Sequence, residues 1–163
     1  MTDLLWVYSH VWNEGTLPGH TTSMIGYFLR HYLSVADRVI LYAASDISDD
    51  TLDIARTFGE RVEIVPFLAE LNDTQFVLQG SRIVSTAQSV YAMWPDCDEF
   101  LRSRGDIRAE LEAHAAANHR ILRAGRGYQM MADDWPTTES IWDGVTLGQR
   151  EDSAAKPVIV KPS

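Results

Sequence analysis

The sequence contains little that would cross-link the chain or hold it in a membrane. Only one of its 163 residues is a cysteine, Cys97, so the chain cannot form an internal disulfide. No apolar run reaches the roughly 18 residues of a membrane span, and the start Met1–Leu4 has none of the basic residues of a signal peptide. Because a single thiol fits a reducing compartment, we expect a soluble cytoplasmic protein.

Basic residues are also scarce. There are 14 lysines and arginines against 23 aspartates and glutamates, which gives a formal net charge of −9 at pH 7. Such a chain would repel a nucleic-acid backbone, so we expect no nucleic acid among its partners. The charge does not exclude a nucleotide, because a bound cation can mediate the contact between carboxylates and phosphates.

Several common catalytic motifs are missing as well. There is no Gly-x-x-x-x-Gly-Lys phosphate loop and no Gly-x-Ser-x-Gly elbow, and Gly125-Arg126-Gly127 does not open a convincing helix as a dinucleotide fingerprint would. The five histidines lack zinc-ligand spacing, and we expect His31 to pack within a helix. Cys97 lies between two carboxylates, which should raise the pKa of its thiol and disfavour a thiolate nucleophile.

The composition that remains is ordinary for a globular protein, with 45% hydrophobic residues, and the length favours one domain, residues 1–163. The apolar patterns predict strands at 4–9, 38–42 and 62–67 and helices at about 24–34 and 51–58. Ser48 or Asp49 can cap the second helix and Gly59 can end it. This order predicts right-handed crossovers and an α/β fold, a mostly parallel sheet flanked by helices.

The second half of the sequence is less regular. Residues 69–80 are expected to form a loop with a helical start, and a helix should follow over 81–91. Asp106 is placed to cap a helix that runs from Ile107 to about Asn118. Short strands are expected at 121–124, 128–131 and 158–160.

The segment Asp96-Cys97-Asp98-Glu99 is the most informative one in the chain. Trp94 precedes it and Phe100-Leu101 follows it, so burial of these apolar residues would place the carboxylates at the end of a strand. On an extended segment Asp96 and Asp98 point to the same side, where they can hold a divalent cation on a substrate's phosphates. The alternative is an acidic turn that only leads to the following helix.

Polar residues follow the other strands too. Asn13 and Glu14 come after the first expected strand, and Asp46 comes after the second. Because ligands bind at the carboxyl ends of the strands of such a sheet, we expect these residues to lie near Asp96 and Asp98. For each residue alone, turn or cap chemistry is the alternative, and for the pair at positions 49–50 helix capping is the favoured interpretation.

These pieces together resemble the GT-A glycosyltransferases of family 2, especially its family-2-like branch, over roughly residues 4–104. The matching pieces are Asn13-Glu14, Asp46-x-Ser48-Asp49-Asp50-Thr51, Trp94-x-Asp96-x-Asp98-Glu99-Phe100-Leu101, and His31 with Asp37-Arg38-Val39-Ile40. The second and third pieces are shorter than the family's patterns. Catalytic domains of the family also continue well past the point where this sequence stops, so we expect a short acceptor part.

The resemblance implies a GT-A-like fold that binds a nucleotide-sugar donor with Mn²⁺ or Mg²⁺. The family uses its Asp-x-Asp motif to hold the metal on the donor diphosphate. Carried over, Asp96 and Asp98 would contact the metal, and Asp96 would also face the donor ribose or sugar. Asn13, Glu14 and Asp46 would lie around the base and ribose.

The resemblance also implies inverting transfer, in which a carboxylate takes the proton from the acceptor hydroxyl. Asp133 and Asp134 are the candidates for this base, with Glu139 as a third, and none of them matches a family motif. The acceptor, whether a saccharide, a lipid or a protein, is not indicated.

Two other functions stay open. A non-catalytic nucleotide- or sugar-binding domain would keep only the donor half, which suits the short C-terminal part. A phosphohydrolase of the Asp-x-Asp type would need the motif after the first strand, followed by a threonine two residues on. Here the motif is central and is followed by Glu99-Phe100, so this function ranks below the others.

Overall fold

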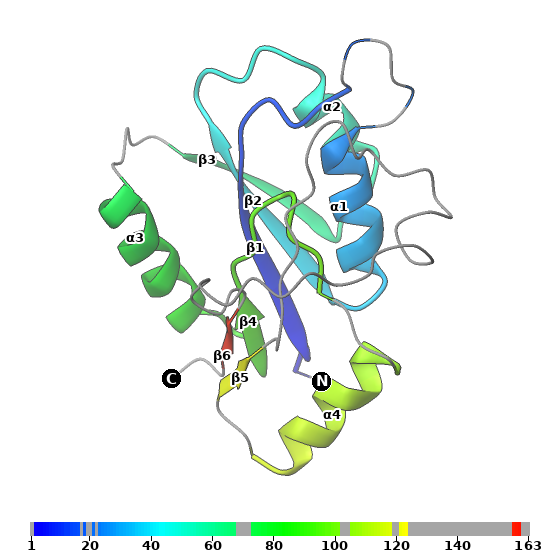
Figure 1. Cartoon of the computed structure of the whole chain (residues 1–163), viewed down its shortest axis with the longest axis vertical. Coiled ribbons are helices and arrows are strands. Elements are labelled where there is room, and N and C mark those ends of the chain that lie inside the picture. Colours follow the sequence, from blue (N-terminus) through cyan, green and yellow to red (C-terminus); the bar gives the residue numbers. More distant parts are fainter. Residues whose placement is uncertain are drawn as a thin grey trace, which may run out of the picture.

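The computed structural model of the chain describes residues 2–16, 18, 21, 23–67, 73–101, 105–118, 121–123 and 158–160. Its elements are β1 (Leu5–Val11), α1 (Met24–Leu33), β2 (Arg38–Ala44), α2 (Thr51–Arg56), β3 (Val62–Phe67), α3 (Asp73–Ser85), β4 (Tyr91–Met93), α4 (Ile107–Ala116), β5 (Ile121–Arg123) and β6 (Val158–Val160) (Figure 1). Within these ranges, no helix has the length and hydrophobicity needed to cross a bilayer.

The strands form one sheet in the order β3-β2-β1-β4-β6-β5. β1 pairs in parallel with β2 and with β4, and β2 pairs in parallel with β3, whereas β6 is antiparallel to β4 and β5. The chain therefore moves outward from β1 to β3 and then returns across β1 to β4. This confirms the predicted α/β fold with a mostly parallel sheet, and it places the switch point between β1 and β4.

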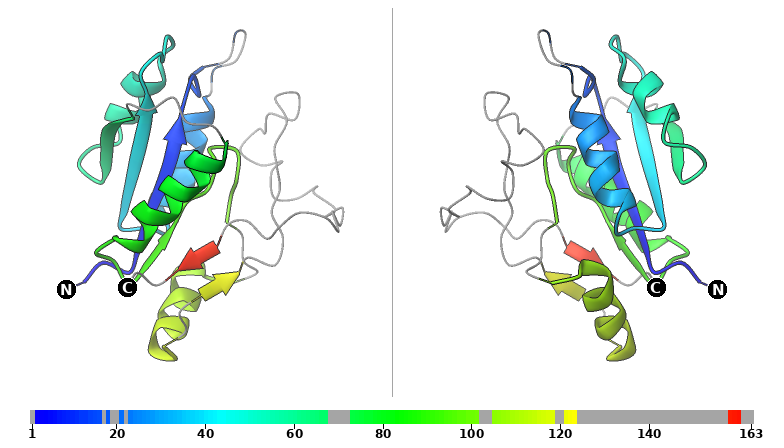
Figure 2. Two further views of the ribbon diagram at one scale, coloured as in Figure 1. Left: turned by 90° about the vertical axis from the view of Figure 1, so that its left-hand side faces the viewer. Right: turned by 90° about the vertical axis from the view of Figure 1, so that its right-hand side faces the viewer.

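Helix α1 covers one face of the sheet, and α3 lies on the other (Figure 2). Ser23 caps the amino end of α1, because its Oγ accepts the Gly26 N–H at 3.0 Å. The fully buried part of its core includes residues of α1 and every second apolar residue of β1 and β2: Ile25, Phe28, Leu29, Tyr32, Leu5, Val7, Val11, Val39 and Leu41. Each such side chain contributes about 1.5–3 kcal/mol through burial.

The face under α3 is aromatic. The Tyr8 and Trp94 rings are nearly parallel, with centroids 6.5 Å apart, and Tyr42 stacks on the same indole at 5.5 Å. Gly80 of α3 lies directly against this indole, because a Cβ at residue 80 would be 3.2 Å from a Trp94 ring carbon. Trp94 is therefore held between the sheet and α3, immediately before the acidic segment.

Two boundaries differ from the sequence-based predictions. The sequence predicts a loop at His10 and Val11, but β1 continues through both because Val11 is fully buried and the pairing with β2 extends to Ala43. It also predicts a helix over 81–91, whereas α3 spans Asp73–Ser85 and Tyr91 begins β4. The Tyr91 N–H donates to the Leu4 carbonyl at 2.8 Å. The apolar pattern of this segment suits a helix or a strand, and pairing with β1 makes it a strand. The strand predicted at 128–131 lies outside the described residues.

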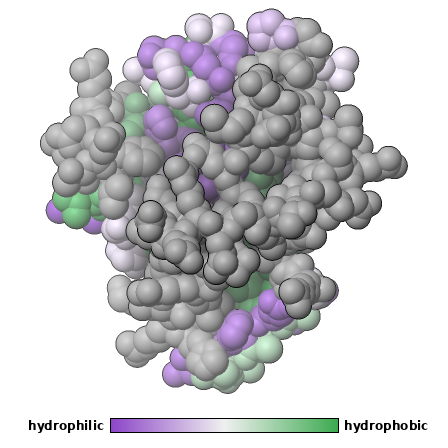
Figure 3. Space-filling view, viewed as in Figure 1, coloured by the Kyte–Doolittle hydropathy of each residue, from purple (hydrophilic) through white to green (hydrophobic). Residues whose placement is uncertain are grey.

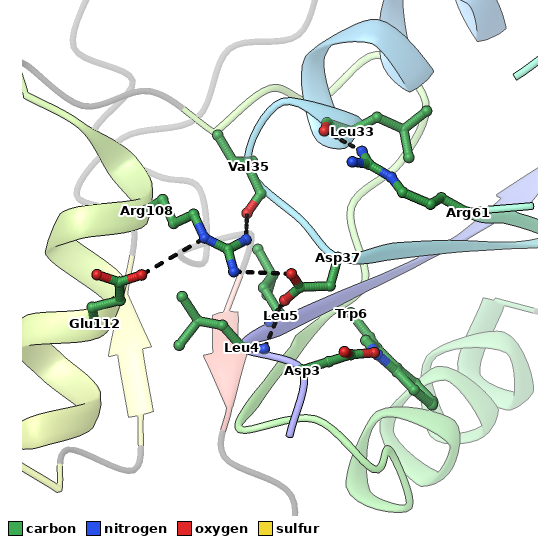
Figure 4. A network of polar contacts seen from close by, with 10 residues as sticks. All are labelled: Asp3, Leu4, Leu5, Trp6, Leu33, Val35, Asp37, Arg61, Arg108 and Glu112. Atoms are coloured by element: carbon green, nitrogen blue, oxygen red, sulfur yellow. Dashed lines mark hydrogen bonds and ion pairs between the residues drawn. The ribbon is translucent and has the colours of Figure 1, made fainter. Parts of the chain in front are cut away.

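Asp37 joins the amino ends of β1 and β2 to α4 (Figure 4). Its carboxylate accepts the Leu4 and Leu5 N–H groups at 2.6 and 3.1 Å and pairs with Arg108 at 2.9 Å. Burial alone would raise the pKa of Asp37, but these bonds outweigh burial and lower it. Asp106 caps α4 by accepting the Arg108 N–H at 2.8 Å, as the sequence predicts. This network lies at the opposite end of the strands from the candidate site.

Candidate functional site

The residues 96–99 after β4 form a tight turn, called here the acidic turn. The Glu99 N–H donates to the Asp96 carbonyl at 3.0 Å, and the Glu99 carboxylate accepts the Asp96 N–H at 3.0 Å. The prediction that Asp96 and Asp98 share one side of an extended segment is therefore wrong in its geometry. Glu99 supplies the reason, because its side chain closes the turn.

The acidic turn rests on the carboxyl half of β1. The Ser9 hydroxyl donates to the Pro95 carbonyl at 2.8 Å, and the Cys97 sulfur lies 3.6 Å from the same hydroxyl. Ser9 and Cys97 are both buried, and burial with the nearby carboxylates, Glu14 first among them, raises the pKa of the Cys97 thiol. Cys97 is thus an apolar anchor without thiolate character, as the sequence predicts.

The loop after β1 is hydrogen-bonded to the loop after β2. Asn13 has a left-handed backbone, with φ 50°, and its side-chain oxygen accepts the Ser48 N–H at 2.8 Å. Further on, the Gly15 N–H donates to Asp49 at 2.9 Å and the Thr16 N–H donates to Asp50 at 2.7 Å. Asn13 is predicted to lie around the base and ribose, and its amide oxygen here serves to join the two loops.

The pair at positions 49–50 does more than cap α2. The Asp49 carboxylate accepts the Thr51 N–H at 3.0 Å and the Thr51 hydroxyl at 2.6 Å, which is the predicted capping role, and it also accepts the Gly15 N–H. Asp50 occupies the cap position itself, but its side chain makes no capping bond and instead holds Thr16. Both carboxylates therefore fix the β1 loop in place.

Glu14 is the residue that this loop presents to the acidic turn. Its carbonyl accepts the Ile25 N–H of α1 at 2.8 Å, so its backbone is fixed against the start of that helix. Burial, followed by the carboxylates of Asp98, Asp49 and Asp96, raises the pKa of Glu14 to about 7. The carboxylates that follow β1 and β4 thus lie near enough at the switch point for their charges to affect Glu14. Their roles toward a metal or a nucleotide stay predictions.

His10 and Asp46 lie at the same edge of the sheet. Burial lowers the pKa of His10, while the negative charges of Asp96 and Asp46 oppose this effect. The imidazole also packs edge-on against Phe67 of β3, with ring centroids 5.1 Å apart. The sequence gives no reason to select His10, because its significance depends on β1 extending two residues further than predicted.

The carboxylates of the site can hold a cation only if a bound ligand supplies some of the coordinating oxygens. In the described part of the chain, no three histidine, cysteine or carboxylate groups are grouped so as to enclose a metal ion. Mg²⁺ commonly takes one or two carboxylates and completes its shell with water and substrate phosphates. Asp96 and Asp98 fit this pattern. Burial is the main cause of the raised pKa of Glu14, and the negative charges of Asp98, Asp49 and Asp96 add to it; a cation would offset this second part.

The surface around these loops is polar. Hydrophilic residues gather at the end of the molecule where α2 and the loops after β1 and β2 lie (Figure 3).

Asp133 and Asp134, the predicted catalytic bases, and Glu139 lie outside the described residues. Trp12, next to Asn13, is 53% exposed.

We expect Gly15→Ala to loosen the junction between the two loops. A Cβ at residue 15 would lie 2.0 Å from an oxygen of Asp50 and 2.7 Å from an oxygen of Asp49, so both carboxylates must move and their bonds to the β1 loop are lost. We expect a loss of about 1–2 kcal/mol in the free energy of unfolding, measured by urea denaturation. In an Asp50→Ala background the cost should shrink; an equal cost in both backgrounds would contradict the contact.

No protein-family model and no curated protein matches the chain. Solved structures do resemble it. The 4-diphosphocytidyl-2C-methyl-D-erythritol synthase from Anaerococcus prevotii has a TM-score of 0.51 and 12% identity, over 96% of this chain and 69% of that one. A CMP:2-keto-3-deoxy-manno-octonic acid synthetase complexed with CTP has a TM-score of 0.46 and 12% identity, over 73% and 51%. The first likeness supports the α/β fold and nothing finer.

Proposed function

We propose that the chain is a metal-assisted glycosyltransferase. It transfers a sugar from a nucleotide-diphosphate donor, with inversion, to an acceptor that is a saccharide, a lipid or a protein. The observation that carries the proposal is the convergence of Glu14, Asp96 and Asp98 at the switch point between β1 and β4. Ligands of open parallel sheets bind at this point.

The fold supports a nucleotide as part of the ligand. The synthase from Anaerococcus prevotii has a similar α/β arrangement, and its name describes a diphosphocytidyl compound. The negative charge of this chain argues against an anionic ligand that binds without a cation. A nucleotide diphosphate with Mn²⁺ or Mg²⁺ satisfies both conditions.

The residues have distinct roles in this proposal. Asp98 and Asp96 would hold Mn²⁺ or Mg²⁺, which supplies positive charge for the departing nucleoside diphosphate. Glu14 and Asp46 would face the base and ribose, while Asn13 fixes the loop that carries Glu14. Asp133 or Asp134 would take the proton from the acceptor hydroxyl.

The test is calorimetric titration of the whole chain with UDP, GDP, dTDP and CDP, each with Mn²⁺ and with EDTA. We expect one nucleotide to bind with Mn²⁺ and to lose its binding in EDTA. The matching nucleotide sugars are then offered, and release of the nucleoside diphosphate is measured. No binding of any nucleotide by a folded sample would overturn the proposal.

A non-catalytic nucleotide- or sugar-binding domain is the second candidate. It is favoured because the site carboxylates that the structure describes, Glu14, Asp46, Asp96 and Asp98, are all proposed to contact the donor or its metal, whereas the proposed bases lie outside the described residues. Metal-dependent binding without release of nucleoside diphosphate, across a broad set of acceptors, would support it. Release of pyrophosphate from CTP would indicate nucleotidyl transfer instead.

A further inference from the structure

The acidic turn is followed by a segment that is fixed to α1 through one side chain. The Tyr32 hydroxyl donates to the Glu99 carbonyl at 2.9 Å and accepts the Leu101 N–H at 3.2 Å. Tyr32 is completely buried, and 67 positions separate it from Glu99 in the sequence. A buried hydroxyl with both a donor and an acceptor bond holds its partners more firmly than apolar contact alone.

His31 strengthens the same junction. Its imidazole packs edge-on against the rings of Tyr32 and Phe100, with centroids 4.8 and 5.3 Å away. Burial lowers the pKa of His31 to about 4, partly offset by a hydrogen bond with the Leu101 backbone. His31 is therefore a neutral residue that packs and hydrogen-bonds at this junction, as the sequence predicts. The Tyr32 hydroxyl adds a second polar link, because it bonds to both the Glu99 carbonyl and the Leu101 N–H.

The turn is consequently held at both ends. Ser9 fixes the Pro95 carbonyl before it at 2.8 Å, and Tyr32 fixes the Glu99 carbonyl at its end. We infer that Tyr32 is a positioning residue whose hydroxyl keeps the acidic turn, and with it Asp96 and Asp98, in place at the carboxyl end of β1. Its effect on ligand affinity rests on the proposed function, whereas its effect on the turn does not.

The first measurement is amide hydrogen exchange of Tyr32→Phe without ligand, followed by NMR. The variant keeps the ring and removes only the hydroxyl, so the Leu101 amide should exchange at least about tenfold faster while amides in β2 and β3 keep their protection. Tyr27→Phe removes a hydroxyl from the same helix and should leave the Leu101 amide unchanged. Unchanged exchange at Leu101 in Tyr32→Phe would overturn the inference.

The second measurement is the affinity for the nucleotide that binds the unmodified chain with Mn²⁺. We expect Tyr32→Phe and Ser9→Ala each to weaken it about tenfold, because a turn loosened at either end no longer holds both carboxylates in place. Val39→Ala, a core variant in β2 that removes no hydrogen bond to the turn, should lower stability without this effect. A loosened turn with unchanged affinity would overturn the inference. An unmodified chain that binds no nucleotide would overturn the proposed function. In that case the exchange data still decide whether Tyr32 holds the turn.

Discussion

Asp98→Asn should bind the Mn²⁺–nucleotide at least about a hundredfold more weakly than the unmodified chain. The amide keeps the shape of the side chain and removes its charge, so a contact between carboxylate and cation worth several kcal/mol is lost, and each 1.4 kcal/mol corresponds to tenfold in affinity. Calorimetric titration under the conditions that support binding measures the effect.

The same substitution should not weaken the apo fold. Among the neighbouring charges, that of Asp98 has the largest effect on the pKa of Glu14. Neutralisation of Asp98 therefore relieves repulsion within the site. We therefore expect the free energy of unfolding in EDTA to stay constant or rise while binding is lost. This separation distinguishes a site residue from a residue that the fold requires.

Asp53→Asn is the matched control for charge. Asp53 lies on α2, its side chain is 83% exposed, and it pairs with Arg56 of the same helix at 2.7 Å. Its neutralisation also lowers the net negative charge by one unit, but it should leave nucleotide affinity within about twofold. Equal loss of binding in both variants would show that overall charge, and not Asp98, governs the affinity.

The architecture of this site could be predicted because it follows from strand order. Asn13, Glu14 and Asp46 lie in the loops that follow two predicted strands, and parallel strands bring their carboxyl ends to one edge. The alternation of apolar runs with helical patterns was enough to establish that edge. The convergence of Glu14 with Asp96 and Asp98 is therefore a consequence of topology that the sequence contains.

The local geometry could not be predicted in the same way. Glu99 closes the acidic turn with its side chain, and nothing in a run of acidic residues says which of them binds backbone and which faces a ligand. The sequence pattern indicates only that Tyr32 lies on the buried face of a helix. It gives no sign of the partners Glu99 and Leu101, because they are distant in the sequence. Bonds of this kind are set by tertiary packing and carry no local signal.

Glu14→Gln should stabilise the protein at pH 8 by about 2–3 kcal/mol and have almost no effect near pH 4. Burial and the surrounding carboxylates raise the pKa of Glu14 from 4.5 to about 7 in the folded chain. A tenfold difference in proton affinity corresponds to about 1.4 kcal/mol, and solvent screening of the partly exposed carboxylate reduces the total. The folded state therefore binds the Glu14 proton more tightly than the unfolded state does, so stability falls as the pH rises from about 4.5 to about 7. Above that range the full cost is present, and glutamine removes it.

Urea denaturation of both forms in EDTA, at intervals from pH 4 to pH 8, measures this difference directly, because groups common to both chains cancel. Glu60→Gln, at an exposed position next to Gly59, controls for the loss of one carboxylate and should give no difference that grows with pH. A constant offset between Glu14→Gln and the unmodified chain would show that the pKa of Glu14 is not raised in the folded chain. A difference that grows as expected would mean that the folded chain is destabilised by the ionised Glu14 carboxylate. Residues that lower stability in this way are commonly retained for binding or catalysis.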